Sequence, residues 1–512
     1  MRPKRQVLFM MTDTTRYDMV GCYGNKAMKT PNLDELASQG VRFSRAYTTQ
    51  PVCGPARSCI FTGLYPHGTG SFTNTVPLWQ GVKTIGEYLQ PEGIHTALIG
   101  KWHLDGGDYF GNGVCPPGYD PAYWFDMRRY LEGMDEADRR KSRKESPSLE
   151  GGGIPAEFTF GHQICDKAID FVKRYKDEDF FLTISLDEPH GPYLCPEPFA
   201  SMYKDYEMPI TPAHRDNLSE KPEFEKLWGE RRIHEDKQHL HLNPSLFFGC
   251  NSFADSEMGR VMHLVEELCP DAMIVYTSDH GEALDAHSLD LKGPSVYEEI
   301  SHIPLIVRGG AYMHAPAGKI YASVASHVDL VPTFLDYYGI EVPPSLSGVS
   351  MRGVIENPEG PRLRDYALCE FHRYEIDHDG FGGLQFMRAA IGDRYKLAEF
   401  LTDSDELFDD QVDPYEVHNY INDPAHEQVR DEMHQWLMRE MNDTRDPFRG
   451  YQWRCRPWNT KEKKDWECDG YTRQRPSGKG ELVQLDYDTG MEITETVRLK
   501  RKALGFAKKE KE

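Results

Sequence analysis

The sequence predicts an α/β fold: a large, mixed but mostly parallel sheet sandwiched by helices, with a smaller C-terminal α+β subdomain. Three observations support this prediction. Short apolar runs alternate with amphipathic helical patterns through roughly the first 340 residues. Runs this apolar are typical of strands that are buried on both faces of a sheet. From about residue 361 the strand-like runs become shorter and follow one another closely, which indicates a separate small sheet.

The strands predicted for the main sheet are 6–11, 96–99, 180–186, 272–277 and 304–307. Between them, residues 31–40 begin with proline and end with glycine, the expected order for a helix start and stop. Two longer helices are predicted around 164–172 and 258–268, where apolar residues recur at helical spacing. In the subdomain, strands are predicted at 367–371, 386–391 and 395–400, with a helix near 427–441.

Composition divides the 512-residue chain into three predicted parts. They are a catalytic domain over 1–360, the α+β subdomain over 361–445, which we expect to contribute to the pocket, and an extended arm over 446–512. The polar stretches 136–153 and 211–238 are interpreted as surface excursions of the first part, because they are charged and weakly periodic.

Charge and hydropathy exclude several classes of protein. The chain has 59 Lys and Arg against 82 Asp and Glu, a net charge of −23. Such an acidic protein lacks the positive surface that non-specific binding to nucleic acid or an anionic membrane requires. The N-terminal apolar run 7–11 is too short for a spanning helix or a secretory signal. We interpret it as the first strand and expect the protein in the cytoplasm.

The eleven cysteines are odd in number, irregularly spaced and contain no C-x-x-C pair. This pattern argues against a disulfide framework and against a structural zinc site. Most of these cysteines are expected to be small buried apolar residues.

Cys53 is the exception, because it begins the sequence Cys-Gly-Pro-Ala-Arg. Pro55 suits the first turn of a helix, so Cys53 would lie at a helix N-terminus, where anions and thiolates are favoured. Arg57 lies about one helical turn later, so its guanidinium can reach an anion bound at this helix N-terminus. A buried cysteine that merely precedes a proline-initiated helix fits these residues equally well.

This Cys-x-Pro-x-Arg sequence, followed by Thr62 and Gly63, resembles the signature of the formylglycine-dependent (type I) sulfatases of the alkaline-phosphatase-like superfamily. Further blocks resemble that family in the expected order: Asp13 with 21–24, then 100–104 (GKWHL), 189–193 (PHGPY), 277–282 (TSDHGE), and Lys292 with 297–299 and 303–305. The resemblance covers most of 1–340. It implies that a formylglycine-generating enzyme oxidises Cys53 and that the hydrated aldehyde attacks a sulfate ester.

A divalent cation is also implied, by resemblance Ca²⁺, with Asp13, Cys53, Asp279 and His280 as its ligands. Independently of the family, the acidic and histidine residues follow predicted strands, where open α/β sheets place their ligand sites. Many members have a second acidic ligand where this chain has Thr14. The number of ligands and the choice among Ca²⁺, Mg²⁺ and Mn²⁺ therefore stay open.

The resemblance assigns catalytic roles to five further residues. Arg57 would favour the ionised hydrate, and Lys101 would hold sulfate oxygens. His190 and Lys292 would stabilise or protonate the leaving oxygen, and His103 would remove the proton that allows sulfate to leave. Fixed cations aimed at these oxygens would supply electrostatic stabilisation.

The substrate implied is a small sulfated saccharide, with a glycosaminoglycan-derived uronate 2-O-sulfate and a hexosamine sulfate as candidates. Asn74, His372, Arg373 and His378 are the residues predicted to line the pocket. A polar seam between the two domains explains the last three equally well.

Two other functions remain open from the sequence. One is a phosphonate monoester or phosphodiester hydrolase of the same superfamily, whose members can also lack the second acidic residue. The other is a metal-dependent anion-binding protein in which Cys53 is never converted. The absence of G-x-S-x-G and of a P-loop disfavours a serine hydrolase and nucleotide chemistry. The oligomeric state stays open.

Overall fold

The computed structural model describes residues 2–106, 109–149, 153–233, 244–374 and 383–459, together with Leu485 and Gly490. By its contacts the chain divides into two units, Met1–Trp458 and Asn459–Glu512. The fold below is that of the first unit. Beyond residue 459, the predicted arm lies outside the described residues except at Leu485 and Gly490.

A seven-stranded mixed sheet forms the centre of this unit. Its strands are β1 (Gln6–Thr12), β2 (Val41–Tyr47), β3 (His95–Gly100), β4 (Phe180–Ser185), β5 (Met273–Ser278), β6 (His302–Arg308) and β7 (Lys319–Ser326). They lie in the order β3-β4-β1-β5-β6-β2-β7. Four neighbouring pairs are parallel, and β6 runs antiparallel to both β5 and β2. The predicted mostly parallel sheet is therefore confirmed.

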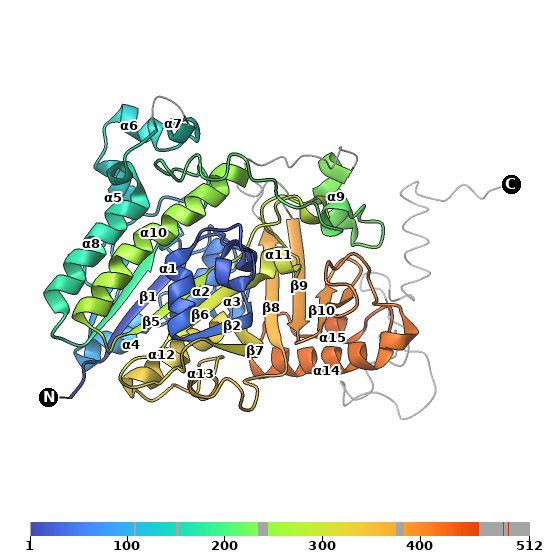
Figure 1. Cartoon of the computed structure of the whole chain (residues 1–512). Helices are drawn as coiled ribbons and strands as arrows, with labels where there is room; N and C mark the ends of the chain where they lie inside the picture. The colour runs from blue at the N-terminus through green and yellow to red at the C-terminus, as the bar shows by residue number, and fades with distance from the viewer. Residues whose placement is uncertain are drawn as a thin grey trace. The chain divides into compact units, whose positions relative to one another are not determined.

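Helices cover both faces of the sheet, as Figure 1 shows. One layer contains α1 (Pro31–Gln39), α8 (Phe160–Tyr175) and α10 (Pro244–Leu268), and the other contains α2 (Cys53–Thr62), α4 (Ile85–Leu89) and α12 (Leu330–Tyr338). Because side chains alternate along a strand, Leu8 and Met10 of β1 pack with the first layer, while Val7, Phe9 and Met11 pack with the second. This explains the continuous apolar run of β1.

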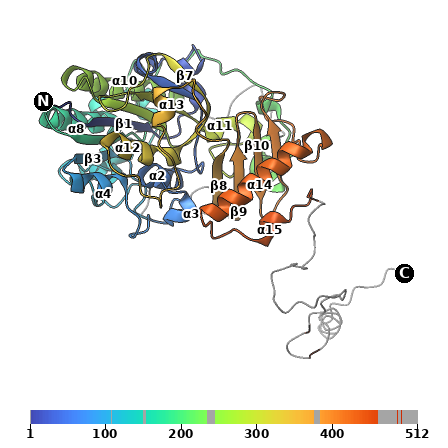
Figure 2. The same cartoon turned by 90° about the horizontal axis from the view of Figure 1, so that it is seen from below.

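The C-terminal subdomain has an antiparallel sheet of β8 (Ala367–Tyr374), β9 (Gly383–Ile391), β10 (Tyr395–Phe400) and β11 (Glu406–Asp409), in the order β11-β10-β9-β8. Helix α14 (Glu427–Asp443) crosses one face of this sheet (Figure 2). The strands and the helix predicted here are all present. β2, β7 and β11 were not predicted.

One interpretation from the sequence is wrong. The stretch 211–238 does not lie wholly on the surface, because its buried residues include four polar or charged ones: His214, Asp216, Lys221 and Glu225. Their polar groups have partners inside the protein. Lys221 Nζ donates to the Glu416 carbonyl at 2.5 Å, and the Tyr297 hydroxyl donates to Glu225 Oε2 at 2.5 Å. Buried polar and charged groups that are hydrogen-bonded in this way are tolerated in the interior.

The other described helices are short. They are η1 (Tyr17–Met19), η2 (Gly21–Tyr23), α3 (Pro66–Thr69), η3 (Gln90–Glu92), α5 (Met127–Glu132), α6 (Glu136–Lys141), α7 (Ser146–Leu149), η4 (Ala156–Phe158), η5 (Ala213–Arg215), α9 (Glu223–Ile233), η6 (Ala286–Ser288), α11 (Glu298–Ser301), η7 (His327–Asp329), α13 (Arg352–Glu356), η8 (Pro424–His426) and α15 (Tyr451–Arg454). Among the helices in the described part of the chain, none is both long and apolar enough to cross a membrane.

Candidate active site

The candidate site lies at the carboxyl ends of four adjacent strands. Asp13 follows β1, Lys101 follows β3 and Asp279 follows β5, with β4 between the first two. Since β3, β4, β1 and β5 are parallel, their carboxyl ends meet at one edge of the sheet, the usual position of ligand sites in open α/β folds.

Cys53 reaches this edge from the first residue of α2. The residue before it has extended backbone, and Pro55 lies in the first turn, as the sequence predicts. The backbone N–H of Gly54 donates to Asn74 Oδ1 at 2.9 Å, so the side chain of Asn74 satisfies one of the free donors of the helix. Every residue of α2 is buried.

Four potential metal ligands converge beside Cys53. One ligand atom from each of Asp13, Cys53, Asp279 and His280 lies within 4.8 Å of all the others. Cys53 Sγ is 3.1 Å from His280 Nε2 and 3.6 Å from Asp13 Oδ1. His280 Nε2 is 3.7 Å from Asp279 Oδ1 and 3.9 Å from Asp13 Oδ1. The two Oδ1 atoms therefore face a common centre.

The second oxygen of each carboxylate is held by a cation. Arg57 Nε donates to Asp279 Oδ2 at 2.9 Å, and Arg57 Nη2 donates to Asp13 Oδ2 at 3.1 Å. Lys101 Nζ lies 2.8 Å from the same oxygen of Asp13. Arg57 is itself fixed by the Lys101 carbonyl and the Ser185 hydroxyl, at 2.8 and 2.7 Å.

His280 has the orientation of a metal ligand. Its Nδ1 lies 2.8 Å from the Gly281 carbonyl, which can only accept, so Nδ1 carries the hydrogen and the Nε2 lone pair faces the carboxylates. Two carboxylates, one imidazole and residue 53 make a donor set that fits a divalent cation.

Burial is the largest single influence on the pKa values of Asp13 and Cys53. Burial raises the pKa of Asp13, yet Lys101, followed by His190 and Arg57, holds it well below the usual range. Burial and the Asp13 carboxylate raise the pKa of the Cys53 thiol to about 12. Before any cation binds, burial, together with the Asp13 carboxylate, thus outweighs the helix N-terminus that we expected to favour a thiolate.

Thr14 supports the two carboxylates. Its hydroxyl donates to Asp13 Oδ1 at 2.5 Å, and its backbone N–H donates to Asp279 Oδ1 at 3.1 Å. It thereby stabilises negative charge at the position where the family resemblance led us to expect a second acidic residue.

The cationic side of the site is also buried. Lys101 Nζ lies 3.0 Å from Asp187 Oδ1. His103 and Lys292 are 6% and 8% exposed. Burial lowers the pKa of Lys292, but Cys53 and the nearby carboxylates raise it to about 12, so it remains an ammonium group. An anion entering here would meet fixed positive charge inside an acidic protein.

The comparisons with known proteins identify the family to which the chain belongs. The profile of the sulfatase family matches residues 5–340, and that of the N-sulphoglucosamine sulphohydrolase C-terminal region matches residues 293–443. The chain is 40% identical over 510 residues to the uncharacterized sulfatase YidJ of Escherichia coli (strain K12), covering 98% of this chain and 99% of that protein. The chain belongs to the sulfatase family. The resemblance stated from the motifs is confirmed, and the protein is a sulfatase-family hydrolase.

More distant relatives of this sulfatase act on different substrates. The N-acetylglucosamine-6-O-sulfatase of Bacteroides thetaiotaomicron is 27% identical, covering 86% of this chain and 87% of that protein. The structure of BT4656 with its substrate D-glucosamine-2-N,6-O-disulfate superposes with a TM-score of 0.70 at 23% identity. The match covers 87% of this chain and 99% of that chain. The phosphonate monoester hydrolase of Agrobacterium radiobacter superposes with a TM-score of 0.73 at 23% identity. The match covers 86% of this chain and 96% of that chain. Both structural matches support the predicted sulfatase-like fold.

The predicted substrate residues of this sulfatase lie in different places. Asn74 is buried against Gly54, next to Cys53. His372 lies in β8 at 1% exposure, with its ring near Phe72 and its Nε2 3.3 Å from Glu370 Oε1, which favours the polar-seam alternative. Arg373 also belongs to β8, but its side chain, like all of His378, lies outside the described residues.

Sequence reasoning missed three residues that contact the predicted ones: Tyr109, Ser185 and Asp187. Ser185 ends β4, within the predicted strand 180–186, and Asp187 comes directly after that predicted strand. Their position at the carboxyl end of a parallel strand was a usable signal. Tyr109 belongs to no motif.

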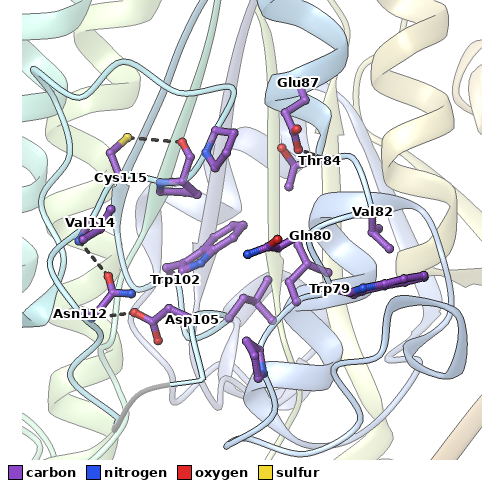
Figure 3. A pocket seen from close by; sticks show the side chains of 15 residues that line it. Trp79, Gln80, Val82, Thr84, Glu87, Trp102, Asp105, Asn112, Val114 and Cys115 are labelled. Carbon is purple, nitrogen blue, oxygen red and sulfur yellow. Dashed lines mark hydrogen bonds between the residues drawn. The ribbon is translucent and has the colours of Figure 1, made fainter.

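A cavity of ≈ 570 Å³ is lined in part by Trp102 and Leu104, which lie on either side of His103 in the sequence (Figure 3). Its lining includes Trp79, Gln80, Trp102, Leu104, Asp105 and Asn112. Trp102 and Leu104 alternate with Lys101 and His103, and both belong to the core on that side of the sheet. The cavity is therefore separated from the catalytic side chains by one stretch of backbone.

Proposed function

We propose that this sulfatase removes sulfate from a small sulfated saccharide, with formylglycine at position 53 and one divalent cation. The observation that carries the proposal is the convergence of Asp13, Asp279 and His280 on Cys53 at the first turn of α2. Buried lysines lie beside this group and provide positive charge for the sulfate oxygens.

When bound, the cation supplies Lewis-acid stabilisation, and the hydrated aldehyde of formylglycine supplies the nucleophile. Asp13, Asp279, His280 and residue 53 would hold the cation. Arg57 favours the ionised form of both carboxylates and orients them through its contacts with their Oδ2 atoms, although burial and Asp13 raise the pKa of Asp279.

Other side chains bind sulfate and move protons. Lys101 and Lys292 bind sulfate oxygens, since both remain protonated in a buried site. His190 and Lys292 stabilise or protonate the leaving oxygen. His103, two residues after Lys101, accepts the proton whose removal allows sulfate to leave.

Relatives support a saccharide substrate. One acts on N-acetylglucosamine 6-sulfate and another is the Delta 4,5-hexuronate-2-O-sulfatase of Bacteroides thetaiotaomicron, 24% identical over 490 residues. We therefore propose a hexosamine sulfate or a uronate 2-O-sulfate released from a glycosaminoglycan. A cytoplasmic location, which would limit the enzyme to small imported saccharides, belongs to the same proposal, and cell fractionation tests it.

For the cation, the family resemblance implies Ca²⁺. His280 contributes an imidazole nitrogen, whereas Ca²⁺ is ordinarily bound through oxygen ligands, so the ion has to be determined directly. Reconstitution of EDTA-treated protein with Ca²⁺, Mg²⁺ or Mn²⁺, followed by activity and bound-metal measurements, identifies the ion.

The central experiment starts with protein produced alongside a formylglycine-generating enzyme. Mass spectrometry of the peptide containing residue 53 establishes conversion, and the protein is then assayed on saccharides sulfated at defined positions. Turnover of at least one saccharide, lost in Cys53→Ala, is the expected result. Full activity in Cys53→Ala would refute the proposed nucleophile.

A phosphonate monoester or phosphodiester hydrolase is the second candidate. Thr14 in place of a second acidic residue favours it, as does the likeness to phosphonate monoester hydrolases. Comparison of kcat/KM on matched aryl sulfate and aryl phosphonate esters separates the two, and a large phosphonate preference would replace the first proposal.

A metal-dependent anion-binding protein is the third candidate. It requires that Cys53 stay a thiol in a host that converts other sulfatases. An unchanged mass at Cys53, together with sulfate binding but no turnover, would support this candidate.

A further inference from the structure

Tyr109 packs against three of the proposed catalytic residues although no motif contains it. Its ring centroid is 4.2 Å from Lys101 Nζ, 5.2 Å from the ring of His190 and 5.6 Å from the ring of His103. The ring is thus a wall of the site on the side where the leaving group is expected.

The hydroxyl of Tyr109 connects two of its neighbours. It donates a hydrogen bond to Asp187 Oδ1 and lies 3.1 Å from His190 Nδ1. Burial raises the pKa of Asp187, but Lys101 and His190 hold it below its usual value, so the carboxylate is ionised and only accepts. The hydrogen of Tyr109 is therefore directed to Asp187, and its oxygen is available to accept from His190.

The contacts of His190 fix its tautomer. Nδ1 lies 3.0 Å from the Gly191 carbonyl and 3.1 Å from the Tyr109 oxygen. The carbonyl can only accept, and the hydroxyl already donates elsewhere, so Nδ1 carries the hydrogen and shares it between the two oxygens. Nε2 is then the nitrogen left to exchange a proton with a substrate.

We propose that Tyr109 is a positioning residue that links Asp187 to His190 Nδ1 and so enables His190 to protonate the leaving oxygen from Nε2. This inference rests on the proposed function. As the S–O bond breaks, the leaving oxygen keeps the bonding electron pair and takes the Nε2 proton. The imidazolium becomes the neutral tautomer described above, and water returns the proton.

The link is needed because the surroundings of His190 oppose its protonation. Burial, Lys101 and Lys292 lower the pKa of His190 to about 3, whereas Asp13 and Asp187 act in the opposite direction. Through Tyr109, the negative charge of Asp187 reaches the imidazole at its far nitrogen. The charge of a bound sulfate ester between the two lysines adds to the same effect.

The variant Tyr109→Phe keeps the ring over Lys101 and removes only the hydroxyl. A poor leaving group needs the proton and a good one does not, so the loss must depend on the leaving group. For an alkyl or sugar sulfate, we expect kcat/KM to fall roughly 10- to 100-fold, mainly in kcat. For 4-nitrophenyl sulfate, we expect a fall of at most about threefold. The Brønsted plot over a series of sulfate esters should steepen.

Tyr123→Phe is the matched control, since this half-buried tyrosine packs against Phe171 and Tyr175. It should leave the whole series unchanged. Asp187→Asn should reproduce the leaving-group pattern of Tyr109→Phe if the two residues act together. Thermal unfolding of each variant verifies that it is folded.

An equal loss on all esters, or no loss on any, would overturn the inference while leaving the proposed function intact. The series can be run with phosphonate esters if these are the better substrates. Converted wild-type protein that hydrolyses neither class of ester would refute the proposed function first, and the inference with it.

Discussion

Replacing Arg57 with alanine tests whether the carboxylate pair depends on its buried counter-charge. The guanidinium is fully buried and donates to both Asp13 and Asp279, at 3.1 and 2.9 Å. Each hydrogen bond to a charged partner contributes about 1.5–3 kcal/mol, so the two lost bonds together amount to about 3–6 kcal/mol. Removing one partner of a buried ion pair independently gives about 3–5 kcal/mol. We expect the metal-free protein to lose this much unfolding free energy.

Urea unfolding of EDTA-treated protein, with and without added divalent cation, measures the effect. In the presence of the cation the loss should be smaller, because positive charge between the two Oδ1 atoms compensates the carboxylates that Arg57 no longer pairs. The difference between the two conditions is specific to the site. A general packing defect would lower the unfolding free energy equally in both conditions.

Arg140→Ala is the matched control. Its side chain is 75% exposed and is paired with the similarly exposed Glu136, and exposed pairs of this kind contribute less than about 1 kcal/mol. A loss below about 1 kcal/mol in Arg57→Ala, or a loss that does not respond to the cation, would refute the reasoning.

Three further changes give distinct results. Gly281→Ala should lower the melting temperature and the bound metal, because a Cβ there would lie 2.0 Å from the Glu299 carbonyl; a wild-type melting curve would contradict this. Glu370→Gln should cost about 3–5 kcal/mol near pH 7. Burial raises the pKa of Glu370, but His67 above all holds that pKa well below its usual value. The stabilisation by Glu370 is therefore present above its unfolded-state pKa and is lost as the pH falls through its folded-state pKa. Urea unfolding from pH 7 to 3 checks this. Asn74→Ala leaves the Gly54 N–H without its acceptor and should cost about 1–3 kcal/mol, with a lower kcat/KM; unchanged values in both assays would exclude this role.

Apolar periodicity was sufficient to predict the centre of the fold. β1, β3, β4 and β5 are buried on both faces, and such strands have no polar side to interrupt the run. β2 contains Arg42 and Arg45, and β7 is an edge strand with exposed positions, so neither has a continuous apolar sequence. The antiparallel direction of β6 depends on its partners and has no local signal.

The candidate site was predictable where strand ends and motif spacing coincide. Asp13, Lys101 and Asp279 follow buried strands, and the structure brings them together with Cys53. Tyr109 was not predicted because its place in the site depends on how the loop after Lys101 folds back against that lysine. The path of this loop is set by tertiary packing and has no pattern in the sequence.

The burial of Cys53 limits the time in which the proposed oxidation can occur. The side chain is 1% exposed, and β5, which is followed directly by its neighbours Asp279 and His280, begins about 220 residues further along the chain. At translation rates of about 5–20 residues per second, the ribosome needs roughly 10–45 s to cover that distance. β5 cannot pair with β1 and close the site before this interval has passed, so an enzyme that oxidises Cys53 has at least this long to reach it. If Cys53 is converted as we propose, faster translation or faster closure of the sheet should lower the fraction of protein that carries the modification.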